Sequence, residues 1–255
     1  MNFVVSLEDA LIRRDHIRTE FSKNEVGFKF FNAVNASNLK NHQEQLGVFF
    51  EDELFSIGEK ACFLSHVALW EYCINTKLDY IVIFEDDVFL SSNSNLYLNE
   101  LSWIPKGVDL IKFEKFEDSP LMSLKTIKLK HDSHLRLLEE RHLGTAGYIL
   151  SKSGAIKLLN LVKKDKQKLK LDELIFNENI KSKYMNIYQF CPALVIQADR
   201  IDSSKLPSQL EDERSKNKIV KMKVRRNILD KVMIEFNRLI VQFKRLFCRL
   251  KINLN

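Results

Sequence analysis

Glycine is scarce in this sequence, and its placement excludes the two best-known phosphate-binding loops. The seven glycines stand at positions 27, 47, 58, 107, 144, 147 and 154. No combination of them gives G-x-G-x-x-G, the turn of a dinucleotide-binding Rossmann domain, or G-x-x-x-x-G-K, the P-loop. A phosphate-bearing ligand must therefore be held in another way.

Cysteine and long apolar runs are also lacking. The four cysteines are far apart and form no C-x-x-C pair, which suits a reducing compartment rather than a disulfide framework. Residues 1–6 carry no basic segment before their apolar run, so they predict a strand and not a signal peptide. No run reaches the roughly 20 apolar residues of a transmembrane helix. We expect a cytoplasmic protein, peripheral on the inner face of the cytoplasmic membrane.

The net positive charge of the chain lies in its C-terminal tail. Residues 214–255 hold 13 Lys or Arg and two acids, a net charge of +11, so the other residues carry +6 − 11 = −5. Apolar residues in this tail recur every three or four positions, which predicts an amphipathic helix with one basic face. Such a helix suits an anionic membrane surface, at about 1 kcal/mol for each basic residue. Packing on the catalytic domain or in a homodimer is the alternative. Nucleic acid is not expected, because no aromatic stacking platform is evident.

The first 210 residues predict an α/β domain, and residues 211–255 form the separate tail. Residues 3–7, 26–31, 80–84, 108–113 and 148–151 are expected strands, and residues 10–22 an expected helix. Ser56 and Glu59 fit a capping box that opens a helix running to about Asn75. Buried strands preceded by helices favour a sandwich with a mainly parallel central sheet, whose ligands bind beyond the carboxyl ends of the strands.

The apolar run 80–84 ends abruptly in Glu85, Asp86 and Asp87. Adjacent carboxylates repel one another unless a cation lies among them, and Mg²⁺ or Mn²⁺ prefers such oxygen ligands. The triplet therefore predicts a metal site, and a solvated acidic turn is the alternative explanation.

Three further stretches are ambiguous on pattern alone. Gly144-Thr145-Ala146-Gly147 allows close backbone approach to a ligand, or is simply a tight turn before a strand. Asp172 and Glu173 lie among apolar residues, where a general base or a helix start would fit. The histidines at 131, 134 and 142 lie among basic residues that would oppose a metal ion, so we expect a surface helix there.

Taken together, these stretches resemble glycosyltransferase family 25, the lipooligosaccharide galactosyltransferases. The matching stretches follow one another through most of the first 200 residues. They are residues 5–7, Arg13-Arg14, residues 30–33, residues 58–66 with Trp70, residues 84–88, residues 144–149 with Ser151, Asp172, and residues 192–194 with Gln197. The resemblance is weak at residues 35–55 and after Ser204.

The resemblance implies a GT-A-like nucleotide-binding fold and Mn²⁺ or Mg²⁺ bound to the donor diphosphate. Asp87 would be the metal ligand, with Glu85 in the metal shell or on the donor. The other donor-binding candidates are Ser6, Leu7, Arg13, Glu59, His66, Asp86, Gly144, Thr145 and Gly147, and Gln197 is the acceptor-binding candidate. His66 and Glu59 have a structural role as their alternative.

The usual reaction of the family converts α-linked UDP-galactose into a β-galactoside, so a carboxylate must take the proton of the acceptor hydroxyl. Asp172 is the candidate base, with Glu173 and Glu114 as rivals. The acceptor would be a lipid-linked saccharide. Transfer of glucose or N-acetylhexosamine, and an inactive scaffold with the same fold, are the alternatives. A nucleotidyltransferase would need a Gly- and Arg-rich triphosphate loop, which the sequence lacks.

Overall fold

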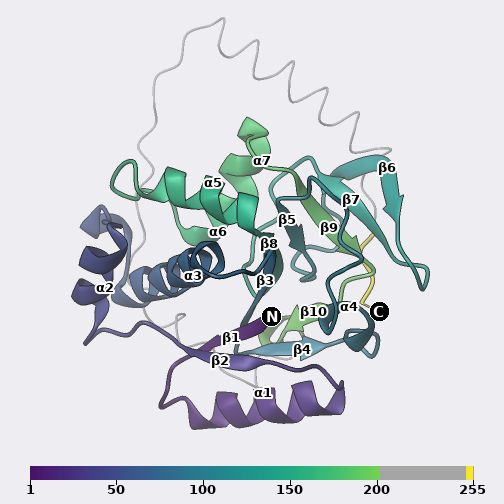
Figure 1. The fold of residues 1–255 in the computed structure, drawn as a ribbon, viewed down its shortest axis with the longest axis horizontal. Helices are drawn as coiled ribbons and strands as arrows, with labels where there is room; N and C mark the ends of the chain where they lie inside the picture. Colours follow the sequence, from purple (N-terminus) through teal and green to yellow (C-terminus); the bar gives the residue numbers. More distant parts are fainter. Residues whose placement is uncertain (202–250, 255) are drawn as a thin grey trace, which may run out of the picture.

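A computed structural model describes residues 1–201 and 251–254 of the chain (Figure 1). Its centre is an eight-stranded sheet with the strand order β2-β1-β3-β8-β5-β9-β7-β6. The strands are β1 (Asn2–Ser6), β2 (Lys29–Asn32), β3 (Tyr80–Glu85), β5 (Leu110–Lys112), β6 (Met122–Lys128), β7 (His134–Leu138), β8 (Gly147–Ser151) and β9 (Ile187–Cys191). A smaller sheet pairs β4 (Val88–Leu90) with β10 (Val195–Gln197).

The large sheet is mixed, although most of its strands point the same way. β1 pairs in parallel with β2 and β3, and β5 pairs in parallel with β9. β8 is antiparallel to both β3 and β5, and β7 is antiparallel to both β6 and β9. Six strands therefore share one direction and only β7 and β8 oppose it, which agrees with the predicted mainly parallel sheet.

Helices cover both faces of the sheet (Figure 1). Helix α1 (Leu11–Lys23) lies on one face, while α2 (Leu39–Leu46), α3 (Ile57–Asn75) and α5 (Lys152–Val162) lie on the other. The shorter helical segments are η1 (Asp52–Leu54), α4 (Asn95–Leu98), α6 (Leu171–Glu173), η2 (Leu174–Glu178), α7 (Asn179–Ser182) and α8 (Ala198–Ile201). In the described part of the chain, no helix is long and apolar enough to span a bilayer.

Strand β3 is buried on both faces, as its continuous apolar run predicted. Ile81 and Ile83 pack into the core beneath α3 and α5, whereas Val82 and Phe84 pack into the opposite core beneath α1. Successive side chains of a strand point to opposite faces, so an apolar residue at every position suits a central strand. This burial fixes β3 firmly and brings its carboxyl end, Glu85, beside that of β1.

The predicted start of α3 is confirmed. The Ser56 side chain accepts a hydrogen bond from the Glu59 amide at 3.2 Å, and the Glu59 carboxylate accepts one from the Ser56 amide at 3.1 Å. This capping box satisfies two backbone donors that a helix start would otherwise leave free. It also fixes the residue at which α3 begins.

The surface helix expected near His131 and His134 is wrong. β6 and β7 form an antiparallel hairpin, and its turn places His131 and Asp132 at φ 51° and 56°. Two consecutive residues in the left-handed region end any regular right-handed helix. His142 is buried instead, with its ring edge-on to Phe116.

The predicted basic helix in residues 211–255 lies almost wholly outside the described residues. The last described residues do contact the catalytic domain. The Ile252 amide donates to the Asp118 carbonyl at 2.8 Å, and the Asn253 carbonyl accepts from the Ala193 amide at 2.8 Å. Residues 252 and 253 therefore lie against the domain formed by residues 1–201.

Candidate active site

A cavity of about 490 Å³ opens beyond the carboxyl ends of β1 and β3. Parallel strands of an open sheet commonly bind ligands at this edge. Of the residues expected from the sequence to form the site, the cavity is lined by Ser6, Leu7, Arg13, Glu59, His66, Glu85, Asp86, Asp87, Gly144, Thr145, Asp172 and Gln197. Residues from six separate stretches of the chain thus surround one cavity.

Asp86 is held by the carboxyl end of β1 and the start of α1. The Ser6 hydroxyl donates to its carboxylate at 2.6 Å, and the Arg13 guanidinium donates to the other oxygen at 2.6 Å. Arg13 also lies 3.7 Å from the Asp87 carboxylate. Asp86 is therefore a neutralised, oriented residue that fixes the turn carrying Glu85 and Asp87.

Glu85 and Asp87 are bridged by neutral donors. The Thr145 hydroxyl donates to one oxygen of Glu85 at 2.6 Å, and the Gln197 amide donates to the other at 3.1 Å. The same amide reaches Asp87 at 3.4 Å. Thr145 and Gln197 thus position the two carboxylates without neutralising them.

The pKa values of both carboxyl groups are raised by this crowding. Burial, followed by the neighbouring Asp87 charge, raises the pKa of Glu85 to about 8. Burial also raises the pKa of Asp87 to about 6, the repulsion from Asp86 adds to the shift, and the Arg13 guanidinium opposes it. Each group would release its proton more readily if a cation lay beside it.

This donor set fits a hard divalent cation. Glu85 and Asp87 offer carboxylate oxygens to the same cavity, and their positive neighbour, Arg13, is already bonded to Asp86. Mg²⁺ and Mn²⁺ are commonly bound by one or two carboxylates together with substrate phosphates. Asp87 and Glu85 are the residues that would hold such an ion.

Three residues expected at the site do not line the cavity. Gly147 lies in β8, where an added Cβ would come within 2.5 Å of the Phe113 ring, so this glycine serves packing. Glu173 accepts a hydrogen bond from Asn177 at 2.6 Å and is not among the cavity residues. Glu114 is fully buried. Of the candidate bases, only Asp172 lines the cavity.

Glu114 forms a buried ion pair behind the cavity wall. Lys112 donates to its carboxylate at 2.6 Å and to the Gly144 carbonyl at 2.6 Å, and both side chains are completely buried. The second Glu114 bond, from the Ala146 amide at 3.1 Å, ties the same loop. Gly144 has φ +89°, and a Cβ there would meet Glu114 at 2.5 Å. The pair thus holds the loop that presents Thr145 to Glu85.

His66 belongs to a buried hydrogen-bonded group beneath the cavity. Its Nδ1 lies 2.8 Å from the Tyr148 hydroxyl, which also accepts a hydrogen bond from the Trp70 indole at 2.9 Å. Complete burial lowers the pKa of His66 to about 3, so the imidazole is neutral at physiological pH. Both the structural and the ligand-binding interpretation of His66 are compatible with this placement.

The sequence analysis missed several cavity residues, among them Lys170, Asp199, Arg200 and Phe116. Lys170 forms an ion pair with Glu59, and the Arg200 guanidinium lies over the Phe116 ring at 4.0 Å. These side chains come from loops and short helices without a distinctive pattern. Only the spacing of Cys62 and His66, one helical turn apart, could have indicated that Cys62 faces the same space.

Comparisons with known proteins identify a family. The family model for glycosyltransferase family 25 (LPS biosynthesis protein) matches residues 1–175. The lipooligosaccharide biosynthesis protein lex-1 of Haemophilus influenzae is 32% identical over 87% of this chain and 85% of its own length. Lipooligosaccharide biosynthesis protein lic2B of Haemophilus influenzae is 35% identical over 88% and 86%. The lacto-N-neotetraose biosynthesis glycosyltransferase LgtE of Neisseria gonorrhoeae is 30% identical over 96% and 90%.

Solved structures match more weakly. A glycosyltransferase involved in glycosylation of the PBCV-1 major capsid covers 77% of this chain and 91% of its own, with 6% identity and a TM-score of 0.40. That score is too low to support an argument about function. The match over residues 1–175 and the three relatives show that the chain belongs to glycosyltransferase family 25.

Proposed function

We propose that this glycosyltransferase moves galactose from UDP-galactose to a lipooligosaccharide acceptor with inversion at the anomeric carbon. The observation that carries the proposal is the pair of incompletely neutralised carboxylates, Glu85 and Asp87, in a cavity at the end of β3. The names of the relatives support a saccharide of the bacterial surface as acceptor. The resemblance to family 25 galactosyltransferases supports UDP-galactose as the donor.

A Mn²⁺ or Mg²⁺ ion bound with the donor would supply Lewis-acid stabilisation of the negative charge on the departing diphosphate. The protein orients the carboxylates of Asp87 and Glu85 that would bind the ion. Gln197 bonds to both carboxylates, Thr145 bonds to Glu85, and Arg13 restrains Asp86 and approaches Asp87. This preorganisation keeps the reorganisation of the site small when the donor arrives.

Asp172 is the residue proposed to accept the proton of the acceptor hydroxyl. It lines the same cavity as Asp87, and its carboxylate is oriented by the Glu173 amide at 2.8 Å. A general base needs hydrogen-bond reach to the proton that it removes. Its rivals are less suitable, because Glu114 is buried in an ion pair and Glu173 bonds to Asn177.

A transfer assay tests the proposal. Purified enzyme and Mn²⁺ would be given UDP-galactose, UDP-glucose or a UDP-N-acetylhexosamine, together with truncated lipooligosaccharide, and the product linkage determined by NMR. We expect transfer of galactose in a β-linkage. Transfer of glucose or N-acetylhexosamine would replace the donor assignment, an α-linkage would refute inversion, and no transfer would favour an inactive scaffold.

We also propose that the basic tail holds the enzyme at an anionic membrane surface, where a lipid-linked acceptor is exposed. The support is compositional, since residues 214–255 carry a net charge of +11. Deleting the tail would also remove the contacts of Ile252 and Asn253 with the domain. The cleaner test replaces Arg225, Arg226, Lys231 and Arg238 with Gln and measures binding to vesicles that contain phosphatidylglycerol. Reduced binding is expected, and unchanged binding would refute the membrane role.

A further inference from the structure

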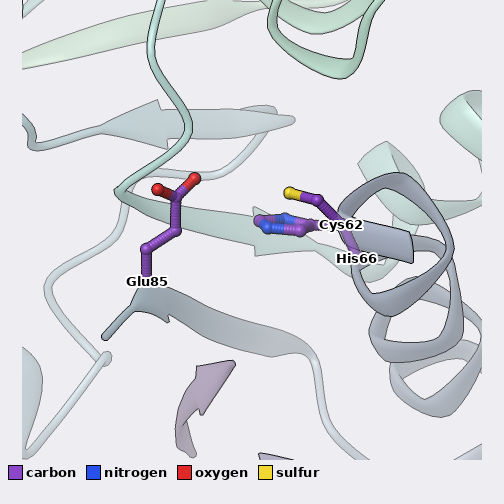
Figure 2. A group of neighbouring side chains, drawn as sticks. All are labelled: Cys62, His66 and Glu85. Carbon is purple, nitrogen blue, oxygen red and sulfur yellow. The ribbon is translucent and has the colours of Figure 1, made fainter. Parts of the chain in front are cut away.

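Three side chains that can bind a metal ion converge at the inner end of the cavity. Cys62 and His66 project from one face of α3, and Glu85 projects toward them from the end of β3 (Figure 2). One ligand atom from each lies within 4.8 Å of the others. All three residues also line the cavity, so the space between them is reached from the same side as the carboxylates of Asp86 and Asp87.

His66 provides a second, independent indication of a ligand. Its side chain is completely buried, and its Nε2 has no hydrogen-bond partner among the described residues. A buried polar atom without a partner costs about 1–3 kcal/mol, so it calls for an explanation. A bound ion would provide one, because the imidazole nitrogen donates a lone pair to a metal.

The second ring nitrogen of His66, Nδ1, has the kind of oxygen neighbour that metal-binding histidines usually have. Histidines that bind metals usually donate their second ring N–H to an oxygen acceptor, which fixes the ring. Here the Tyr148 hydroxyl lies 2.8 Å from Nδ1, and the Trp70 indole holds that hydroxyl in turn at 2.9 Å. The hydroxyl oxygen has two lone pairs, so it can accept from both rings at once.

The donor set differs in kind from the carboxylates beside it. Cys62 offers sulfur, His66 nitrogen and Glu85 oxygen, a combination that suits Zn²⁺, whereas Mg²⁺ and Mn²⁺ favour oxygen ligands alone. Zinc ligands lie about 2.0–2.3 Å from the ion and therefore about 3.5 Å from one another. Atoms within 4.8 Å of one another reach that spacing with small side-chain adjustments.

We propose that Cys62, His66 and Glu85 form a second cation site, which takes Zn²⁺ or a similar thiol-binding ion and leaves one position open to the cavity. The Cys62 thiol binds as thiolate and releases its proton to solvent. Glu85 keeps its bonds to Thr145 and Gln197, because each carboxylate oxygen has a further lone pair.

The site has a consequence that rests on the proposed function. Glu85 is shared between the two proposed sites, so an ion bound to Cys62, His66 and Glu85 competes with the donor's metal ion for the Glu85 carboxylate. Occupation by Zn²⁺ therefore inhibits the transfer reaction. This inhibition is relieved by a chelator and is not overcome by raising the concentration of the acceptor.

Cobalt binding tests the site without any measurement of activity. The full chain, reduced and free of metal, is titrated with Co²⁺ and followed by absorbance, because a cobalt–thiolate bond gives a near-ultraviolet charge-transfer band. We expect this band in the wild type and its loss in Cys62→Ser. Cys73→Ala is the matched control, since Cys73 is buried on the same helix outside the cluster, and it should keep the band.

Competition with Zn²⁺ then gives the affinity. Glu85→Gln and Cys62→Ser are each expected to weaken Zn²⁺ binding by more than about tenfold, with circular dichroism confirming that the variants are folded. No charge-transfer band in the wild type, or a band that persists in Cys62→Ser, would overturn the proposal. This readout does not require turnover. A negative result would therefore refute the second cation site and leave the glycosyltransferase proposal untouched, and a failed transfer assay would leave the cation site untouched.

Discussion

The buried pair Lys112–Glu114 and the cavity carboxylates Glu85, Asp86 and Asp87 are neighbouring charged groups that differ in how they are neutralised. Behind the cavity, one lysine faces one carboxylate, and both Lys112 and Glu114 are completely buried. In the cavity, three carboxylates follow β3, and the guanidinium of Arg13 is the one cation that the described residues bring into salt-bridge distance of them. The first group is balanced in charge, whereas the second has fewer positive than acidic groups.

The comparison separates structural charge from functional charge. The buried pair balances its own charge and also fastens the 144–146 loop through the Gly144 carbonyl and the Ala146 amide. In the cavity, Arg13 pairs with Asp86, whereas Glu85 and Asp87 accept hydrogen bonds from the neutral side chains of Thr145 and Gln197, which orient them without neutralising them. Such crowding of carboxyl groups costs stability, and it supports the proposal that a ligand brings positive charge to the site.

The largest effect is expected from Asp87→Asn. This change keeps the shape of the side chain but removes the charge that would bind the metal–donor complex. A bound metal contributes several kcal/mol to the transition state, so we expect the transfer rate to fall about a thousandfold. Steady-state kinetics measures the loss, and an unchanged melting temperature would confirm that the fold is intact. Wild-type activity in this variant would remove Asp87 from the metal site.

Lys112→Met should reduce stability rather than act on chemistry directly. Removing one member of a buried ion pair leaves an uncompensated charge and costs about 3–5 kcal/mol of unfolding free energy. Denaturant unfolding measures this loss. The double variant Lys112→Met/Glu114→Gln is the control, and it should recover part of the loss because the unpaired carboxylate is gone. Equal losses in the single and double variants would show that packing, not charge, explains the effect.

Asp172→Asn should lower turnover while leaving donor affinity largely unchanged. General bases contribute about 10²–10⁴-fold to rate, and we expect a loss within that range. The corresponding amide substitution, Glu173→Gln, is the control, because Glu173 does not line the cavity. If Glu173→Gln were the more damaging substitution, the proton would be accepted there instead.

A smaller effect is expected on the pH dependence of stability in the metal-free protein. The pKa of Glu85 is raised from 4.5 to about 8, so the folded state binds this proton more tightly than the unfolded state. The stabilisation is fully present below pH 4.5 and is lost as the pH rises through about 8. Melting temperatures of the wild type and Glu85→Gln would be compared across this range. The downward slope should be shallower in the variant, and equal slopes would contradict the raised pKa.

The central elements could be predicted from the sequence because their determinants are local. The apolar run 80–84 required a buried strand, and Ser56 with Glu59 predicted the start of α3. The hairpin of β6 and β7 was missed because Lys128, Lys130, Asp132 and Arg136 make the segment around its turn look like an exposed helix, and because the turn depends on left-handed residues that are not glycine.

The contacts that organise the site could not be predicted in the same way. Thr145 and Gln197 bond to Glu85 across 60 and 112 residues of sequence. Such contacts depend on the order of strands in the sheet, which no local pattern specifies. The burial of Lys112 and Glu114 is a further example, because alternating charges near a strand end usually indicate an exposed face.

Calorimetric titration of UDP into the metal-free protein, with and without Mn²⁺, tests the central claim most directly. If Glu85 and Asp87 lack a cation that arrives with the donor, UDP should bind tightly only when Mn²⁺ is present, and Asp87→Asn should abolish the difference. Equal UDP affinity in the presence and absence of Mn²⁺ would contradict the claim, because the carboxylates would then have no cation to bind.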